Sequence, residues 1–400
     1  MVKGDIVQQF NQSPGDQSAV DVSVVVPVHN GEKDIEQCLG RIRDSVGCSF
    51  EIVVVNDAST DQTEEIAEAM ATRVITLNEQ SGPAAARNRA VKECRGEIVV
   101  FVDCDVMVSK QTLRGLRDHL DDNQWAAVFG SYDRYPKVRN LVSVYKNLMH
   151  HYYHQRSGRE ANTFWSGCGA IRKSVFEEMG GFNQSFARPS IEDIELGMRI
   201  LEAGYSIGSV PEIQVQHTKR WTLKKLVYTD LFLRGIPWTR LMLQAGSIQN
   251  DLNVSRSQRA CVFIAGLTVA VFAVLVCFQP LIAILPLLVA VLLLLTDGIT
   301  VRPASRPFAL WAGAALLLTL VAFTLVLQPL TAWMFVGVLL IGLITQKSLR
   351  FLISAGGLPF AVLCVPLHLI YYLYSGFAFA AGASLHLLGV PFYKSKGKEQ

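Results

Sequence analysis

The sequence predicts an α/β domain with a mostly parallel sheet, followed by an α-helical transmembrane domain. Up to about residue 213, β-branched apolar runs alternate with segments of helical periodicity, which is typical of a sheet with helices on both faces. Several of these runs end at acidic or amide side chains. After Gln258, charged residues nearly vanish from the 400-residue chain, which indicates membrane-spanning segments.

The alternating elements are assigned in order from the spacing of their apolar residues. Strands are expected where β-branched residues run together, and helices where apolar residues recur every three or four positions. The expected elements are a strand at 22–28, a helix carrying Ile35, Leu39, Ile42 and Val46, a strand at 51–55, a helix at 63–71, a strand at 73–77, a helix at 84–94 and a strand at 97–102.

Polar side chains follow three of these strands, and Asp103 and Asp105 are the most informative. Side chains alternate along a strand, so two residues at positions i and i+2 can face one point at its carboxyl end, where open α/β sheets bind ligands. Two carboxylates there, completed by substrate phosphates, suit Mg²⁺ or Mn²⁺. Each polar residue alone is an ordinary turn residue, but together they favour a nucleotide-binding crevice. The other strand ends contribute His29, Asn30, Glu32 and Asp57.

The distribution of charge and cysteine narrows the class of protein. The chain carries +3 in total, but residues from Arg259 onward sum to +6, which leaves −3 for the preceding part. Neither part resembles a nucleic-acid-binding face, so no nucleic-acid partner is expected. The eight cysteines are scattered without a Cys-x-x-Cys pair. This pattern indicates neither a zinc site nor a disulfide framework, and it fits a reducing compartment.

The apolar part contains five stretches close to the ~20 residues that cross a bilayer. Before them, basic residues interleave with Trp, Leu and Phe, which is typical of a helix in the headgroup plane, with a core helix as the alternative. The candidate spans are about 260–278, 280–297, 308–328, 329–345 and 358–380. The expected organisation is a tail at 1–20, the α/β domain at 21–220, amphipathic helices at 221–258, spans at 259–390 and a basic tail at 391–400.

Basic loops set the expected orientation in the membrane. Arg302 and Arg306, then Lys347 and Arg350, lie between spans, and the positive-inside bias places these loops and the α/β domain in the cytoplasm. Five crossings would put the basic tail outside. Either the break at 356–359 makes one segment re-entrant, or the tail is an exception to the bias.

Six short motifs, in this order, resemble those of family 2 glycosyltransferases with the GT-A fold. The resemblance covers about residues 20–220, does not extend to the membrane part and does not identify the sugar. The motifs are VSVVVPVHN at 22–30, VNDASTD at 55–61, GPAAARN at 82–88, DCD at 103–105, GGF at 180–182 and IEDIEL at 191–196.

The resemblance implies a role for each matching residue, and these roles agree with the chemistry of inverting transfer. An acceptor hydroxyl attacks the anomeric carbon while a nucleoside diphosphate leaves, so a carboxylate must take the proton and a divalent cation stabilises the leaving charge. By this resemblance, Pro27, Asn30, Glu32 and Asp57 would line the nucleotide pocket for a UDP- or GDP-sugar, and Arg87 would lie near the donor phosphates or sugar. Asp103 and Asp105 would hold the metal and the donor, and Asp193 would be the general base.

The chain departs from the family pattern at two places. His29 stands where many relatives have Tyr or Thr. The stretch His217-Thr218-Lys219-Arg220-Trp221 resembles the Gln-x-x-Arg-Trp motif of processive polysaccharide synthases, but with His in place of Gln. His217 is therefore a candidate third metal ligand or phosphate contact, or a structural residue. Arg220 and Trp221 are candidate acceptor or interface contacts, and Trp221 either stacks on a sugar or anchors the chain at the interface.

These expectations define an inverting, metal-dependent glycosyltransferase integral to the inner or plasma membrane, with its catalytic domain cytoplasmic. It would transfer a sugar to a lipid, a lipid-linked glycan or another membrane-proximal acceptor. The alternatives are a processive synthase that extrudes its polymer, and a transporter or flippase with a non-catalytic nucleotide-binding domain. Transport is disfavoured because Asp297 is the only acid among the apolar stretches. A scaffold with a decayed site is disfavoured because no expected carboxylate is missing.

Overall fold

The computed structural model describes residues 20–186, 188–246, 255–274 and 332–392 of the chain. The chain divides into two compact units, one made of residues 1–252 with 381–400 and the other of residues 253–380. The first unit contains the expected α/β domain, and the second contains apolar helices.

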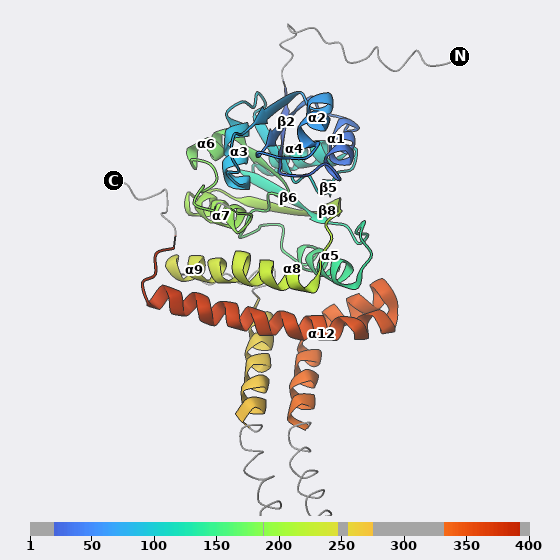
Figure 1. Cartoon of the computed structure of the whole chain (residues 1–400), viewed down its shortest axis with the longest axis vertical. Helices are drawn as coiled ribbons and strands as arrows, with labels where there is room; N and C mark the ends of the chain where they lie inside the picture. The colour runs from blue at the N-terminus through green and yellow to red at the C-terminus, as the bar shows by residue number, and fades with distance from the viewer. Residues whose placement is uncertain (1–19, 187, 247–254, 275–331, 393–400) are drawn as a thin grey trace, which may run out of the picture. The chain divides into compact units, whose positions relative to one another are not determined.

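The first unit is built on an eight-stranded mixed sheet in the order β3-β2-β1-β4-β7-β6-β8-β5 (Figure 1). Strands β3, β2, β1 and β4 are parallel, β7 is antiparallel to both of its neighbours, and β6 and β8 are parallel. The strands are β1 (Val22–Val28), β2 (Phe50–Asn56), β3 (Arg73–Thr76), β4 (Ile98–Val102), β5 (Val106–Met107), β6 (Ala127–Tyr132), β7 (Cys168–Arg172) and β8 (Ile207–His217). This arrangement confirms the predicted fold class.

Helices follow most of the strands and cover the sheet. The expected elements up to residue 102 all form, with ends within three residues of the prediction. The helices of the first unit are α1 (Ile35–Arg43), α2 (Thr63–Met70), α3 (Pro83–Val91), α4 (Thr112–Asn123), α5 (Leu141–His154), α6 (Lys173–Glu178), α7 (Glu192–Glu202), α8 (Leu223–Tyr228), the π-helix η1 (Thr229–Gly235) and α9 (Ile236–Gln244). The last three follow one another without a break, as one continuous helix (Figure 1).

Two hydrophobic cores, one on each face of the sheet, hold the helices in place. On β4, Val100 and Val102 belong to the core that includes α1 and α4, while Val99 and Phe101 belong to the core that includes α3 and α7. This division follows from the two-residue period of a strand, which sends alternate side chains to opposite faces. The continuous apolar run at β4 is therefore what a strand buried on both faces requires.

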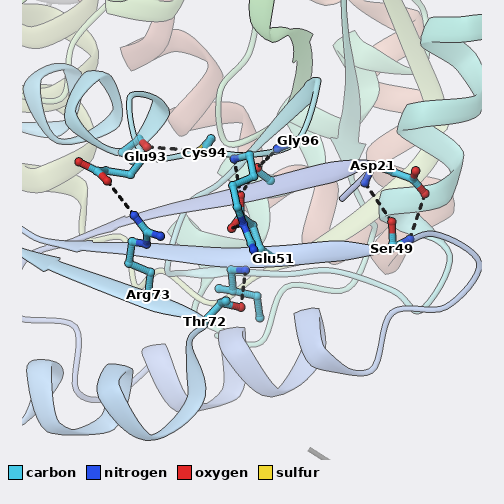
Figure 2. A network of polar contacts seen from close by, with 12 residues as sticks. Asp21, Ser49, Glu51, Thr72, Arg73, Glu93, Cys94 and Gly96 are labelled. Carbon is cyan, nitrogen blue, oxygen red and sulfur yellow. Dashed lines mark hydrogen bonds and ion pairs between the residues drawn. The ribbon is translucent and has the colours of Figure 1, made fainter. Parts of the chain in front are cut away.

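A polar network lies at the amino-terminal ends of β1 and β2, away from the strand ends that carry the candidate site. Figure 2 shows Glu51 at its centre. The Glu51 carboxylate, only 1% exposed, accepts hydrogen bonds from Ser23 Oγ at 2.6 Å and from the backbone N–H of Arg95 at 2.6 Å. The backbone N–H of Gly96 donates in turn to Ser23 Oγ at 2.8 Å. The network joins β1, β2 and the turn before β4.

The second unit contains apolar helices at Arg256–Val274 and Ala332–Ile344, and most of α12 (Gln346–Leu387). The first and the last are long and apolar enough to cross a membrane, with mean hydropathy of 1.7 and 1.9. Helix α12 is broken at Gly357, where φ is 80°, inside the break expected at 356–359. The candidate spans at 280–297 and 308–328 lie outside the described residues.

Candidate active site

The loops after β1 and β2 lie side by side because the two strands are parallel neighbours. Asn30 Oδ1 accepts from the backbone N–H of Thr60 at 2.8 Å, and the backbone N–H of Asn30 donates to Ser59 Oγ at 2.9 Å. His29 Nδ1 lies 2.7 Å from the backbone oxygen of Asp57, which gives this residue a role in joining the loops. Asn30 and Glu32 thus contact the loop that follows Asp57, Asn30 at Ser59 and Thr60 and Glu32 at Asp61 and Gln62. Pro27 lies on β1 opposite Val55.

Both carboxylate oxygens of Asp57 accept hydrogen bonds from backbone N–H groups. Oδ1 accepts from the backbone N–H of Ser81 at 2.7 Å, and Oδ2 accepts from that of Gly82 at 2.9 Å. The residue is 4% exposed. The carboxylate therefore holds the turn that begins α3 against the end of β2, in addition to any contact with a nucleotide base.

Asp103 and Asp105 lie in a turn between β4 and β5, and not on the strand itself. The backbone N–H of Val106 donates to the backbone oxygen of Asp103 at 2.9 Å, which closes the turn. The alternation of side chains along a strand therefore does not explain how the pair is oriented. The prediction that strand alternation turns both carboxylates toward one point is wrong. The position at the carboxyl end of β4 is as expected.

Arg87 connects this turn to α7. Its Nη2 donates to Asp103 Oδ1 at 2.6 Å, and its Nη1 donates to Glu192 Oε1 at 3.3 Å. The residue is 4% exposed and Glu192 is 5% exposed, so the guanidinium is a buried cation between two carboxylates. The motif contained Glu192, but only the structure identifies its partner.

Asp193 lies in the first turn of α7, beside Glu192. Its Oδ2 accepts from the backbone N–H of Ser166 at 3.1 Å and from Ser166 Oγ at 3.2 Å. Burial raises the pKa of Asp193, although the hydrogen bonds from Ser166 act in the opposite direction. Burial and the charge of Asp193 likewise raise the pKa of Glu192. Asp193 as a residue is half-buried.

His217 reaches the site because β8 pairs with β5, which places it opposite Val106. Its Nε2 lies 3.7 Å from Asp105 Oδ2, and Lys219 Nζ lies 3.7 Å from the same oxygen. The imidazole stacks on Tyr132 with ring centroids 4.4 Å apart. Burial and the nearby Lys219 lower the pKa of His217 to about 3, so the ring is neutral at physiological pH.

Arg220 and Trp221 follow His217, the last residue of β8. Arg220 is exposed, whereas Trp221 is only 3% exposed. The backbone N–H of Trp221 donates to Ser143 Oγ at 2.8 Å, and its backbone oxygen accepts from Asn140 Nδ2 at 2.9 Å. Because an interfacial anchor needs an exposed ring, the buried indole does not fit the anchoring role expected for Trp221.

The π-helix η1 contributes charged residues that the sequence analysis did not assign to the site. Asp230 pairs with Lys146 of α5 at 2.6 Å and with Arg234 at 3.8 Å. The positive charge of Arg234 opposes the burial-driven rise in the pKa of Asp193 and adds to the lowering of the pKa of His217. Isolated π-helical turns are frequent at functional sites, but this irregularity has no signature in the apolar spacing.

The side chains at the β4–β5 turn are suitable ligands for a divalent cation. Asp103 and Asp105 supply hard oxygen ligands and are 37% and 21% exposed, and His217 supplies a neutral imidazole nitrogen on the same side as Asp105. In the part of the chain that the structure describes, no three His, Cys, Asp or Glu side chains converge as a complete metal site. Two carboxylates with substrate phosphates completing the shell are the arrangement that Mg²⁺ commonly adopts.

Comparisons with known families match the α/β domain. The family model described as "Glycosyl transferase family 2" matches residues 23–180, and that described as "N-terminal domain of galactosyltransferase" matches residues 146–223. The poly(ribitol-phosphate) beta-N-acetylglucosaminyltransferase TarS of Staphylococcus aureus is 40% identical over 108 residues, 25% of this chain and 19% of that protein. The pre-mycofactocin glycosyltransferase of Mycobacterium tuberculosis is 28% identical over 233 residues, 56% of this chain and 48% of that protein. The chain thus spans half or less of the length of these relatives.

Solved structures with a similar chain path include two glycosyltransferase complexes. The mannosyltransferase PcManGT from Pyrobaculum calidifontis, in complex with GDP-Man and Mn²⁺, is 18% identical with a TM-score of 0.45, over 95% of this chain and 92% of that one. S. aureus TarS 1–349 in complex with UDP-GlcNAc is 24% identical with a TM-score of 0.43, over 58% of this chain and 67% of that one.

Proposed function

We propose that this protein transfers a sugar with inversion from a UDP- or GDP-sugar to a lipid or lipid-linked acceptor at a membrane. The chain belongs to glycosyl transferase family 2 and has the GT-A fold. Glycosyltransferase activity is common to the family. The observation that carries the finer proposal is the buried link from Asp103 through Arg87 to Glu192, because it joins the donor side of the site to the helix that bears Asp193.

The donor binds across the ends of β1, β2 and β4. The nucleoside lies against the joined loops that contain Asn30 and Asp57, and the diphosphate lies at the turn of Asp103 and Asp105. Asp103 and Asp105 would hold Mg²⁺ or Mn²⁺, with His217 as a candidate third ligand, and the cation supplies positive charge opposite the leaving diphosphate.

The acceptor hydroxyl lies at Asp193. As its oxygen forms a bond to the anomeric carbon, the bond to the diphosphate breaks and the diphosphate leaves with the electron pair. Asp193 takes the hydroxyl proton. Burial raises the pKa of Asp193 and makes it a stronger base than an exposed aspartate. Arg87 offsets the charges of Asp103 and Glu192, so the site does not accumulate uncompensated carboxylates.

The continuous helix from α8 to α9 supports an acceptor at the membrane. Lys224, Tyr228 and Phe232 recur at every fourth position and are exposed, so they share one helix face. A basic and aromatic face of this kind binds the headgroup region of a bilayer. Together with the apolar helices of the second unit, this face supports an enzyme that meets its acceptor at the membrane surface.

The path of the chain bears on its topology in the membrane. The described chain leaves the first unit after Gly246, and the segment from Ala381 to Phe392 belongs to that unit again. A chain that leaves and rejoins one compact domain crosses a membrane an even number of times. Four crossings, with the α/β domain and the basic tail both cytoplasmic, satisfy this condition and the positive-inside bias.

A donor screen tests the proposal. The full-length protein in lipid nanodiscs is incubated with UDP- and GDP-sugars, Mg²⁺ or Mn²⁺ and a lipid extract, and products are identified by mass spectrometry. We expect one donor to yield a lipid that has gained a single sugar, and Asp193→Asn to abolish the product. A polymer would favour the processive synthase. Absence of transfer with every donor, combined with substrate movement across vesicles that lack nucleotide-sugar, would favour the transporter.

A further inference from the structure

The segment after α12 folds back onto the α/β unit. Gly389 has a φ of 65°, and the backbone N–H of Val390 donates to Leu385 O at 3.1 Å, which is a common way for a helix to end in a sharp turn. The last turns of α12 lie close to α9, since a Cβ added at Gly382 would be 2.8 Å from Thr239 Cβ. Val390 and Phe392 are thereby brought beside α9.

Arg240 of α9 holds this segment in two ways. Its Nη2 donates to the backbone oxygen of Val390, and its guanidinium carbon lies 4.5 Å from the centre of the Phe392 ring. Arg240 is 7% exposed although it has no carboxylate partner in the described residues. A buried arginine that binds a backbone carbonyl and an aromatic face defines the position of both.

Phe392 also packs against the loop before α7. The rings of Phe186 and Phe392 are 6.3 Å apart in an edge-to-face arrangement. Phe186 forms a small buried cluster with Ile191, Met198 and Leu241, and Phe392 packs against it. This cluster is separate from the two cores of the sheet, so the loop and the start of α7 depend on it for packing.

The same loop leads directly to the candidate base. Ser190 Oγ donates to the backbone oxygen of Leu233 in η1, and the backbone N–H of Ser190 donates to Glu192 Oε2 at 2.8 Å. Ile191 then precedes Glu192 and Asp193. A shift of the loop is therefore transmitted to Asp193 through a short stretch of backbone.

We propose that Phe392 is a positioning residue for Asp193: in contact with both Arg240 and Phe186, it fixes the loop that begins α7. The kinetic consequence rests on the function proposed above. The described members of this cluster include no residue of the donor loops after β1 and β2, so loss of the Phe392 ring should slow transfer without weakening donor binding.

The test compares Phe392→Ala with a matched control in full-length protein in nanodiscs. Leu388→Ala removes an apolar side chain four residues earlier that is 77% exposed, and Phe392→Tyr retains the ring. Hydrogen–deuterium exchange is measured for peptides that contain Ser190–Asp193, together with kcat and the donor KM. For Phe392→Ala we expect exchange up to about tenfold faster there and kcat about tenfold lower, with donor KM within about twofold. Leu388→Ala and Phe392→Tyr should resemble the wild type.

Three results would overturn the inference. They are unchanged exchange in Phe392→Ala, faster exchange with unchanged kcat, and a joint loss of kcat, donor affinity and thermal stability that Phe392→Tyr does not restore. The last would indicate general destabilisation. If the wild-type protein transfers no sugar, the proposed function fails, and the exchange measurement still decides whether Phe392 fixes the loop.

Discussion

The guanidinium of Arg87 donates to Asp103 at 2.6 Å and so ties the turn after β4 to α3, the helix that precedes β4. Its second contact, with Glu192, extends the link to α7. One buried cation thus serves two carboxylates that are far apart in the sequence. Its removal leaves Glu192 buried without its cation, whereas Asp103 is 37% exposed and stays in contact with water.

Arg87→Met should destabilise the α/β domain by about 3–5 kcal/mol, because breaking a buried ion pair leaves uncompensated charge. Arg89→Met on the same helix is the matched control, since Arg89 is 45% exposed and pairs with Glu93 at the surface. That control should cost less than about 1 kcal/mol. Urea denaturation followed by tryptophan fluorescence measures both. Equal midpoints for the two variants would contradict the role assigned to Arg87.

Asp193→Asn should lower kcat by about 10²–10⁴, which is the usual contribution of a general base. The amide keeps the shape of the side chain, so the donor affinity measured by calorimetry should stay within about twofold. Glu202→Gln changes an exposed acid at the other end of α7 and should leave kcat unaltered. A variant Asp193→Asn with full activity would exclude Asp193 as the base.

The pH dependence of kcat follows from the environment of Asp193. Burial raises the pKa of Asp193 above the usual value of 3.8, so the group binds a proton at a pH where an exposed aspartate is ionised. A protonated carboxyl cannot accept the acceptor's proton, and the rate should therefore fall as pH decreases through that raised pKa. Steady-state rates from pH 4 to 8, in steps of about 0.5, measure the profile. An acid limb at the ordinary aspartate pKa would refute the prediction.

The sequence predicted the elements that depend on local pattern. Apolar alternation and helical spacing marked β1 through β4 and their helices, because burial on two faces constrains those residue types directly. The antiparallel insertion of β7 and the contacts of Arg87 with Glu192 depend on segments far apart in the chain, which one sequence does not reveal. Asp103 and Asp105 were located correctly, but their turn was taken as a strand end.

The aromatic contacts of Phe392 and the burial of Trp221 could not be predicted from the sequence either. A basic tail was expected at 391–400, and nothing in the spacing of Phe392 indicated that it packs on Phe186. Trp221 next to Arg220 is typical of an interface, yet Trp221 is only 3% exposed. Such pairings are decided by tertiary packing, which overrides local preference.

If the donor diphosphate and the two aspartates share a cation as proposed, chelation should abolish transfer, and either Mn²⁺ or Mg²⁺ should restore it. His217→Ala tests the third position. If His217 Nε2, which lies 3.7 Å from Asp105, contributes to binding, the metal concentration for half-maximal rate should rise about 10–100-fold. A metal titration of the rate measures this. Full activity in excess EDTA would exclude metal dependence, and an unchanged titration would assign His217 a structural role.

The network around Glu51 predicts how stability depends on pH (Figure 2). Burial alone would raise the pKa of Glu51, but hydrogen bonds from Ser23 and Arg95 outweigh it and hold the pKa below the usual value of 4.5. The ionised form is therefore stabilised by folding. This contribution is present above the unfolded-state pKa and is lost as pH falls through the lower pKa of the folded protein.

Glu51→Gln should lower the free energy of unfolding by about 2 kcal/mol at pH 7, since hydrogen bonds to a charged group are the stronger ones. The variant should also lose less stability than the wild type between pH 5 and about pH 3, because it has no carboxylate to protonate at this position. Glu97→Gln, an exposed acid next to Gly96, serves as the control and should follow the wild-type curve. Urea unfolding at each pH gives the free energies. If the wild type and Glu51→Gln ran parallel across this range, the ionised carboxylate would contribute nothing to the fold, and the network would owe its stability to packing alone.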